Sequence, residues 1–257
     1  MGGGGPLVRV ARAGPVVTVT LDSPHNRNAL STALLGELLA ALREAQADPE
    51  VRVVVLTGAG PVFCSGADLQ ERLHPPEPAG SGAEPLPTVG DVLTCLVGLP
   101  QPVVALVNGP ARAGGLGLVA ACDLAVAGPA TTFAFTEVRV GVAPAVIAVP
   151  ALRVMGRRAF ARYALTGDVF DATQAAAAGL LTAVDDDPAG WVDRAVRSIL
   201  GSSPVAVAAT KGLLADADWD ADLAAAEALS DQLFGSADGA EGMAAFLAKR
   251  PPRWVVD

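Results

Sequence analysis

Residues 103–127 read VVALVNGPARAGGLGLVAACDLAVA, and this stretch decides the fold class of the chain. The runs 103–107 and 123–127 are rich in valine and other apolar residues, which is typical of buried strands. Between them a Gly-rich turn leads into GGLGLVAAC at 114–122, whose small apolar residues predict a closely packed helix. A strand, a buried helix and a second strand in this order indicate an α/β protein.

The residues before this stretch continue the same alternation. Alternating apolar residues predict one strand, and the run VRVVVL predicts a second. Leucines at helical spacing between these strands predict a helix that Ser31 or Thr32 caps. The predicted elements are strands 15–21 and 51–56 and helices 31–47 and 91–98, with a Pro-, Gly- and Ser-rich surface loop at 74–90.

From Pro144 onward the pattern is mostly helical. A short strand at 133–135 comes first, and helices are then predicted at 144–155, 157–165, 171–178, 188–200, 203–215, 219–234 and 237–249. Strand–helix alternation followed by helices alone predicts a repeated ββα core with a C-terminal helical layer. The sequence shows no internal repeat and no clear linker between two domains.

The composition disfavours several classes of protein. Of the 257 residues 51% are hydrophobic, and the net charge of −9 without a Lys/Arg run disfavours a nucleic-acid binder. Cys64, Cys95 and Cys122 have no paired spacing, and no Cys/His cluster has metal-binding spacing. Apolar stretches are interrupted before they reach membrane-spanning length, and no secretory signal is visible. We therefore expect a cytoplasmic protein with no metal, no membrane and no nucleic-acid partner.

Two Gly-rich loops are the candidates for a functional site. They read FCSGADL at 63–69 and NGPARAGGLG at 108–117, and each follows a predicted buried strand. Taken singly, each loop is equally well explained as a structural turn. In such a turn glycine adopts an unusual backbone conformation or permits close packing. Together they offer unpaired backbone N–H groups, and a helix beginning near Gly114 directs its free N–H groups outward. Two such donors that converge on one oxygen make an oxyanion hole.

Five segments, in order, resemble the crotonase (enoyl-CoA hydratase/isomerase) family. FCSGADL resembles its motif F-x-x-G-A-D-[LI], and VNGPARAGGLGLVAACDLAVA resembles its second Gly-rich motif. FTEVRVGVAP (135–144) resembles the segment that carries the catalytic glutamate, and YALTGDVFDATQAAAAGLLTAV (163–184) and FLAKRPPRW (246–254) resemble the segments that follow. The combination of AGGLGLVAACD with TEVRVGVAPAVI is similar to bacterial hydratases of the methylglutaconyl-CoA type.

The resemblance implies a fold, a substrate and a set of site residues. The fold is the ββα core shared by crotonases and Clp-type peptidases, with an acyl-CoA site in residues 1–190 and a helical trimerisation region in 191–257. Members bind acyl-CoA thioesters, coenzyme A being part of the substrate rather than a cofactor, and are usually homotrimers or dimers of trimers. The matching oxyanion donors are the amides of Ala67 and Gly114. The matching substrate-binding residues are Ala67, Asp68, Leu69, Gly114 and Arg27.

A single glutamate matches the two catalytic positions of the well-known hydratases. The first glutamate of those enzymes lies three residues after the oxyanion glycine, where this chain has Gly117; the second matches Glu137. Standing alone, Glu137 would be read as a structural carboxylate. Within its motif we expect it to be the catalytic acid/base, with a pKa raised by apolar neighbours such as Phe135 and Val138.

One carboxylate leaves the reaction open. It suffices for hydration if the same water supplies both its oxygen and its proton, and it suffices for moving a double bond from the β,γ to the α,β position. We therefore expect an enoyl-CoA hydratase of fatty-acid or branched-chain acyl-CoA metabolism. The alternatives are a Δ3,Δ2-enoyl-CoA isomerase and a non-catalytic CoA-binding homologue.

Five basic residues keep two interpretations each. Arg112 and Arg139 either pair with a distal carboxylate of the substrate or bind a carboxylate of the protein itself. Arg27, together with Lys249 and Arg250, either contacts the phosphates of CoA or is solvated charge.

Five further features carry narrower expectations. His25 matches a family position at the CoA entrance, and a Ser65 hydrolase would need a histidine that the motifs do not place. Asp68 is expected to orient its own loop, and Asp123 to cap or anchor a strand behind the second loop. The run from Pro75 to Gly90 is expected to be mobile without ligand and to border the acyl pocket.

Overall fold

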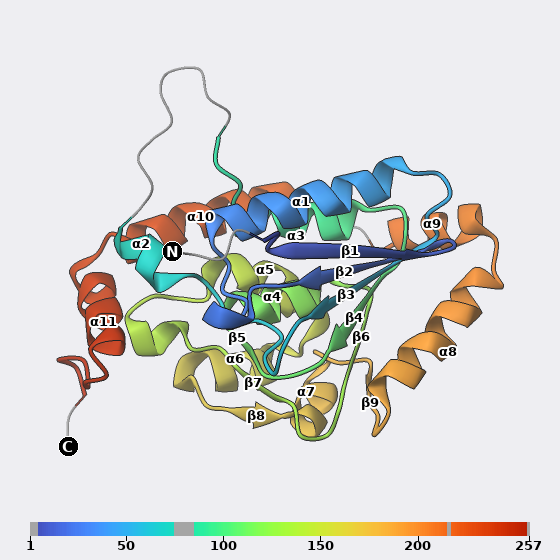
Figure 1. Cartoon of the computed structure of the whole chain (residues 1–257). Helices are drawn as coiled ribbons and strands as arrows, with labels where there is room; N and C mark the ends of the chain where they lie inside the picture. The colour runs from blue at the N-terminus through green and yellow to red at the C-terminus, as the bar shows by residue number, and fades with distance from the viewer. Residues whose placement is uncertain (1–4, 75–84, 215–216, 256–257) are drawn as a thin grey trace.

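The computed structural model describes residues 5–74, 85–214 and 217–255. A six-stranded sheet has the order β1-β2-β3-β4-β6-β9; β1 and β2 are antiparallel, and the other neighbours are parallel. A smaller sheet in the order β5-β7-β8 lies below it in the view of Figure 1. The strands are β1 (Val8–Ala13), β2 (Val16–Leu21), β3 (Val53–Gly58), β4 (Val103–Val107), β5 (Ala111–Arg112), β6 (Leu124–Ala127), β7 (Thr132–Ala134), β8 (Phe170–Asp171) and β9 (Ala183–Val184).

Helices cover both faces of the large sheet. Within the described ranges, no helix combines the length and the apolar character needed to cross a membrane. The helices are α1 (Thr32–Ala47), α2 (Leu69–Leu73), α3 (Val89–Gly98), α4 (Gly114–Ala121), α5 (Ala145–Val154), α6 (Arg157–Thr166), α7 (Ala172–Ala178), α8 (Pro188–Leu200), α9 (Pro204–Gly212), α10 (Trp219–Phe234) and α11 (Ala237–Leu247). Two 3-10 turns, η1 (Pro24–Asn26) and η2 (Glu137–Val140), complete the set.

The two faces of the sheet belong to two hydrophobic clusters. Leu56 and Ala105 face the larger cluster, which includes residues of α1, α3 and α4. Val55 and Val104 face the other side, where they pack with Val192 of α8. The predicted boundary between residues 190 and 191 falls inside α8, a helix that contacts β3, β4 and β6. The trimerisation role of the segment 191–257 stays a prediction.

Most predicted elements are confirmed, with bounds shifted by a few residues. Strand β1 was missed because five of its six residues are exposed, so it shows no alternation of burial. Helix α2 was missed because it has only five residues. Helix α3 begins at Val89 rather than at residue 91, because Thr88 and Asp91 form a capping box that starts it earlier. Much of the predicted mobile loop, residues 75–84, lies outside the described residues.

A partly buried ion pair ties α9 to the core. Lys211 Nζ lies 2.7 Å from Asp123 Oδ2 and donates to the carbonyl oxygens of Leu96 and Gln101 at 3.1 and 3.2 Å. Asp123 Oδ2 also accepts the N–H of Val103, the first residue of β4, at 2.7 Å. The expectation that Asp123 anchors a strand behind the second loop is therefore confirmed.

We expect Lys211→Met to lower the free energy of unfolding by about 2–4 kcal/mol, measured by urea denaturation. The Asp123 side chain is 19% exposed in the pair, and an uncompensated charge in so sheltered a place is costly. Arg194→Met is the matched control, because Arg194 pairs with Asp185 at 2.7 Å while its side chain is 55% exposed. That change is expected to cost under about 1 kcal/mol. Equal losses in the two variants would contradict the anchoring role.

The C-terminal helix α11 packs closely on the turn η2. A Cβ on Gly141 would lie 2.3 Å from the carbonyl oxygen of Asp238, and one on Gly242 would lie 2.2 Å from that of Val140. Gly141 also has φ +78, a backbone conformation that favours glycine. Only side-chain-free residues permit this approach, so two glycines set the distance between α11 and the turn that carries Glu137.

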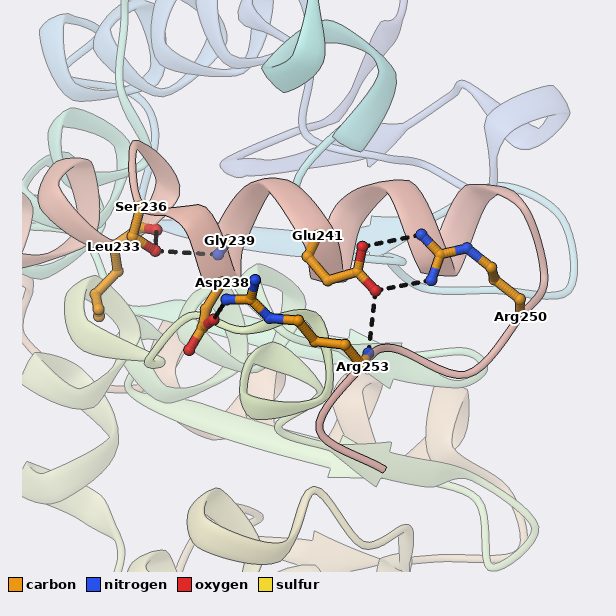
Figure 2. Close-up of polar contacts among 7 residues, drawn as sticks. All are labelled: Leu233, Ser236, Asp238, Gly239, Glu241, Arg250 and Arg253. Atoms are coloured by element: carbon orange, nitrogen blue, oxygen red, sulfur yellow. Dashed lines mark hydrogen bonds and ion pairs between the residues drawn. The ribbon is translucent and has the colours of Figure 1, made fainter. Parts of the chain in front are cut away.

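Charged side chains fasten the chain end to α11, as Figure 2 shows. Glu241 accepts two hydrogen bonds from the Arg250 guanidinium, at 2.7 and 2.9 Å, and one from the backbone N–H of Arg253 at 3.0 Å. The Arg250 side chain lowers the pKa of Glu241 to about 2. Arg253 also pairs with Asp238, so the segment after α11 folds back along the helix.

Candidate active site

A cavity of about 560 Å³ collects most of the predicted site residues. Its walls come from both Gly-rich loops, the turns η1 and η2, and helices α2, α5, α10 and α11. Every residue predicted for catalysis, the oxyanion hole or substrate binding lines it: Arg27, Ala67, Asp68, Leu69, Gly114 and Glu137. Two carboxylates lie among the lining residues, Asp68 and Glu137.

The first Gly-rich loop presents the Ala67 amide as a free donor. Leu30 N–H donates to the carbonyl oxygen of Gly66 at 2.8 Å. In a trans peptide the carbonyl and the next N–H point in opposite directions, so the Ala67 N–H points away from Leu30. The Ala67 N–H donates to none of the described residues, and Ala67 lines the cavity.

The second Gly-rich loop does the same for Gly114. Gly114 is the first residue of α4, so its N–H has no acceptor within the helix, and it finds none among the other described residues. Ala113 before it has φ 47 and ψ −120, a conformation that costs a residue with a side chain about 1–3 kcal/mol. This strained turn directs the chain from β5 into α4 and leaves the helix N-terminus at the cavity.

Packing brings the two amides close together. Arg112 N–H donates to the Cys64 carbonyl oxygen at 2.9 Å, which joins the loops edge to edge. A Cβ on Gly66 would lie 3.4 Å from the Gly114 nitrogen, and one on Gly114 would lie 3.9 Å from the Ala67 nitrogen. Gly66 itself has φ +91, and a Cβ there would lie 2.7 Å from the Cβ of Ala113, so this position requires glycine. That the two amides share one thioester oxygen stays a prediction.

Glu137 carries a buried carboxylate oxygen without a partner. It is the first residue of η2, and its Oε2 is buried and bonded to no described residue. Burial is the main cause that raises its pKa to about 7, and a hydrogen bond from its own backbone N–H opposes the rise. The expected pKa rise is confirmed, and Glu137 lines the same cavity as Ala67 and Gly114.

Asp68 is already engaged within its loop. It caps α2: its Oδ1 accepts the N–H groups of Gln70 and Glu71 at 3.0 and 3.3 Å. Its Oδ2 accepts a longer bond from Asn26 at 3.4 Å. These bonds hold Asp68 in place as the N-cap of α2, and the expected orienting role is confirmed. Among the two lining carboxylates, Glu137 is the one with a buried oxygen that bonds to no described residue.

A side chain from α5 covers the position of the missing glutamate. A Cβ on Gly117 would lie 2.6 Å from Cγ2 of Ile147, and Ile147 itself lines the cavity. Gly117 does not line it. Helices α4 and α5 therefore approach so closely at this point that a second carboxylate has no room.

The structure separates the basic residues into two groups. Arg27, Arg112 and Arg139 line the cavity, whereas Lys249 and Arg250 are not among its lining residues. Arg112 donates to the carbonyl oxygens of Ala111 and Thr132 and to the Thr132 hydroxyl, and burial lowers its pKa.

Arg139 and Arg250 both bind neighbouring groups of the protein. Arg139 donates to the Gly167 carbonyl at 3.0 Å and lies 3.4 Å from Asp168, so this arginine binds a carboxylate of the protein. Arg250 is paired with Glu241. Neither contact excludes a ligand at the remaining guanidinium nitrogens.

Nothing in the described chain assembles a hydrolase triad at Ser65. Its hydroxyl donates to the Asn26 carbonyl at 3.3 Å, and no described histidine bonds to it. His25 Nδ1 instead lies 3.5 Å from the Ser23 hydroxyl. The described residues also hold no cluster of three His, Cys, Asp or Glu side chains that could bind a metal ion.

Comparison with known proteins agrees with this geometry. The chain matches the family model described as "Enoyl-CoA hydratase/isomerase" over residues 11–256. It is 42% identical to an enoyl-CoA hydratase from Mycobacterium avium of known crystal structure, with a TM-score of 0.85 and coverage of 97% of this chain and 99% of that one. A mevalonyl-coenzyme A hydratase from Beauveria bassiana is 31% identical, covering 93% of this chain and 91% of its own.

A third relative comes from an animal. The protein named "Enoyl-CoA hydratase domain-containing protein 3, mitochondrial" of Danio rerio is 35% identical, with coverage of 96% of this chain and 87% of its own. These relatives and the structural match confirm the predicted crotonase-like fold. The chain belongs to the enoyl-CoA hydratase/isomerase family of enzymes.

Proposed function

We propose that this protein is an enoyl-CoA hydratase in which Glu137 is the single acid/base and the amides of Ala67 and Gly114 hold the thioester oxygen. The observation that carries the proposal is the buried, unpartnered Oε2 of Glu137 in the cavity that both free amides border. A native carboxylate oxygen is rarely buried without a partner, and such exceptions are common at catalytic sites.

The residues suit the addition of water to an α,β-unsaturated thioester. Ionised Glu137 accepts a proton from a water molecule as the water oxygen bonds to the β-carbon. The electron pair of the double bond moves toward the thioester oxygen, where two N–H donors stabilise the negative charge. The α-carbon then takes a proton from the Glu137 carboxyl group, which restores the carboxylate. Every proton and electron pair is accounted for by substrate, water and Glu137.

A second candidate is a Δ3,Δ2-enoyl-CoA isomerase. The observation in its favour is that Ile147 covers Gly117, so that one base faces the cavity from η2 and none from α4. Isomerisation needs one base, which removes a proton from the α-carbon and returns it to the γ-carbon through the same stabilised enolate.

Two substrates separate the candidates. Purified protein is mixed with crotonyl-CoA, and loss of the conjugated enoyl-thioester absorbance reports hydration. A 3-enoyl-CoA is tested in parallel, where a gain of that absorbance reports isomerisation. Turnover of the first substrate alone supports a hydratase, and turnover of the second alone supports an isomerase. If tight acyl-CoA binding occurs without turnover across a panel of chain lengths and branches, the protein is a non-catalytic homologue.

We expect kcat/KM for crotonyl-CoA to rise with pH to a plateau, with a midpoint near 7. Glu137 has a pKa raised to about 7, and only its ionised form accepts a proton from water. The measurement is a pH profile between about 5 and 9 at constant ionic strength. A profile without an inflection in that range would contradict the assignment of Glu137 as the base.

Assembly and pathway are proposed from the family alone. We propose a homotrimer or a dimer of trimers, measurable by sedimentation equilibrium, that works in the cytoplasm on fatty or branched acyl-CoA. Several relatives, that of Danio rerio among them, are named as mitochondrial, so the cytoplasm is proposed from the sequence and not from the family.

A further inference from the structure

Asn28 is a buried polar residue, and both Oδ1 and Nδ2 of its side chain form hydrogen bonds to the backbone. It is 0% exposed and has φ 54, a left-handed conformation that Asn tolerates better than most residues. Its Oδ1 accepts the N–H of Ser23 at 2.8 Å. Its Nδ2 donates to the carbonyl oxygens of Ala59, Val62 and Phe63, at 3.0, 2.9 and 3.1 Å. One amide group therefore connects the segment 23–30 with the residues that lead into the first Gly-rich loop.

Three backbone hydrogen bonds extend this connection to both sides of Ala67. They run between the segment 27–30 and the loop 65–68. Ser65 N–H donates to the Arg27 oxygen at 3.1 Å, Leu30 N–H to the Gly66 oxygen at 2.8 Å, and Asp68 N–H to the Leu30 oxygen at 3.5 Å. The bond at Gly66 fixes the peptide plane that contains the Ala67 N–H. Asn28 lies in the segment that makes all three bonds.

We propose that Asn28 is a positioning residue for the oxyanion hole, because it fixes the segment that sets the direction of the Ala67 N–H. The inference rests on the proposed function of that amide. Asn28 is absent from the residues that line the cavity, so it acts through the backbone and not through contact with substrate. The half of the oxyanion hole at Gly114 stands on α4, to which the Asn28 side chain makes no hydrogen bond.

The first test is the variant Asn28→Asp. It keeps the size, the left-handed preference and the acceptor for Ser23, but it places an oxygen against three carbonyl oxygens. We expect kcat for crotonyl-CoA to fall about 10²-fold, as when one oxyanion donor is lost, with little change in KM. Asn28→Gly, which accepts the left-handed φ and removes all four bonds, is the second variant and is expected to behave similarly.

Asn108→Asp is the matched control. Asn108 is exposed, accepts the Gly58 N–H at 3.1 Å and donates to the Gly60 oxygen at 2.9 Å. Like Asn28, it is a side-chain amide that bonds to the backbone of the turn at residues 58–60. Unlike Asn28, it makes no bond to the segment 27–30, and it does not line the cavity. We expect its kcat to stay within about twofold of the parent, because the hydrogen bonds of Asn108 do not involve the segment 27–30 that holds the Ala67 peptide.

A spectroscopic measurement separates positioning from general loss of structure. Crotonyl-CoA labelled with ¹³C at the thioester carbonyl is bound to Glu137→Gln protein, which does not consume it, and the carbonyl stretch is recorded by infrared difference. Two hydrogen bonds from the protein lower that frequency relative to free crotonyl-CoA. In Asn28→Asp/Glu137→Gln we expect about half of the shift to be lost, because one of two donors is displaced. In Asn108→Asp/Glu137→Gln the full shift should remain.

Each outcome decides a separate claim. A full shift in folded Asn28→Asp/Glu137→Gln protein overturns the inference and leaves the proposed function standing. Absence of any shift in Glu137→Gln itself overturns the proposed oxyanion hole. If neither Asn28 variant folds, as judged by circular dichroism and thermal melting, while Asn108→Asp does, Asn28 holds the fold as a whole and the positioning role is overturned.

Discussion

Glu137→Gln is expected to lower kcat by about 10⁴-fold or more while binding of acyl-CoA stays within a few-fold of the parent. Glutamine keeps the size of the side chain but cannot accept and return a proton. General acid–base catalysis contributes roughly 10²–10⁴-fold, and in the proposed mechanism one group makes both transfers. Under the same proposal binding rests on the amides of Ala67 and Gly114 and on the coenzyme A portion, which the substitution leaves unchanged. The measurement is steady-state turnover of crotonyl-CoA together with calorimetric binding.

The same variant has a second signature in its stability. Burial raises the pKa of Glu137 to about 7, so the folded state favours the protonated carboxyl group. The resulting stabilisation is complete below the unfolded pKa of about 4.5, and it is lost as the pH rises through 7. At pH above 7 we therefore expect Glu137→Gln to be more stable than the parent by about 1–3 kcal/mol, an advantage that shrinks as the pH falls.

Glu44→Gln serves as the control, because Glu44 is an exposed carboxylate on α1. It should change neither kcat nor the pH dependence of unfolding. Near-normal kcat in Glu137→Gln would place the chemistry on another residue. An unchanged kcat combined with the expected gain in stability would mean that Glu137 is buried for a reason other than catalysis.

Gly117→Glu is expected to destabilise the protein by at least about 3 kcal/mol and to remove most of the activity. The family's two-glutamate hydratases suggest the opposite, namely that a carboxylate here adds a second acid/base. In this chain, however, even the first side-chain carbon would lie 2.6 Å from Cγ2 and 3.0 Å from Cβ of Ile147. A branched side chain fixed on α5 cannot swing away, so α5 must move and the wall of the cavity moves with it.

A series of variants separates the steric cause from the charge. Gly117→Ala adds only the first carbon and should cost about 1–3 kcal/mol. Gly117→Glu/Ile147→Ala removes the obstructing branch and should recover part of the lost stability, measured by urea denaturation. If Gly117→Glu alone is as stable and as active as the parent, the helices are not in close contact at this point. If the double variant folds and hydrates crotonyl-CoA faster than Ile147→Ala, the carboxylate at 117 has reached the substrate.

The sequence by itself determined the order of the main elements and the family. Strand β4 and helices such as α1 and α8 carry their periodicity within a single continuous segment. The candidate residues Ala67, Gly114 and Glu137 were also found from the sequence, because each stands inside a short motif whose order along the chain matches the family. Edge strand β1 was not predicted, because five of its six residues are exposed and it lacks the alternation of buried and exposed residues on which strand prediction depends.

Only the tertiary structure decided how these residues are placed. Three features depend on segments that are far apart in the chain. Oε2 of Glu137 lacks a partner among the described residues, Ile147 fills the space beside Gly117, and Asn28 bonds to residues just before the first Gly-rich loop. The physical reason is that backbone conformation is governed by near neighbours in sequence, whereas burial, unpaired donors and a raised pKa are set by whatever distant segments pack against a group. The residue types of a motif can be read from a short segment, whereas their burial and hydrogen-bond partners depend on the folded chain.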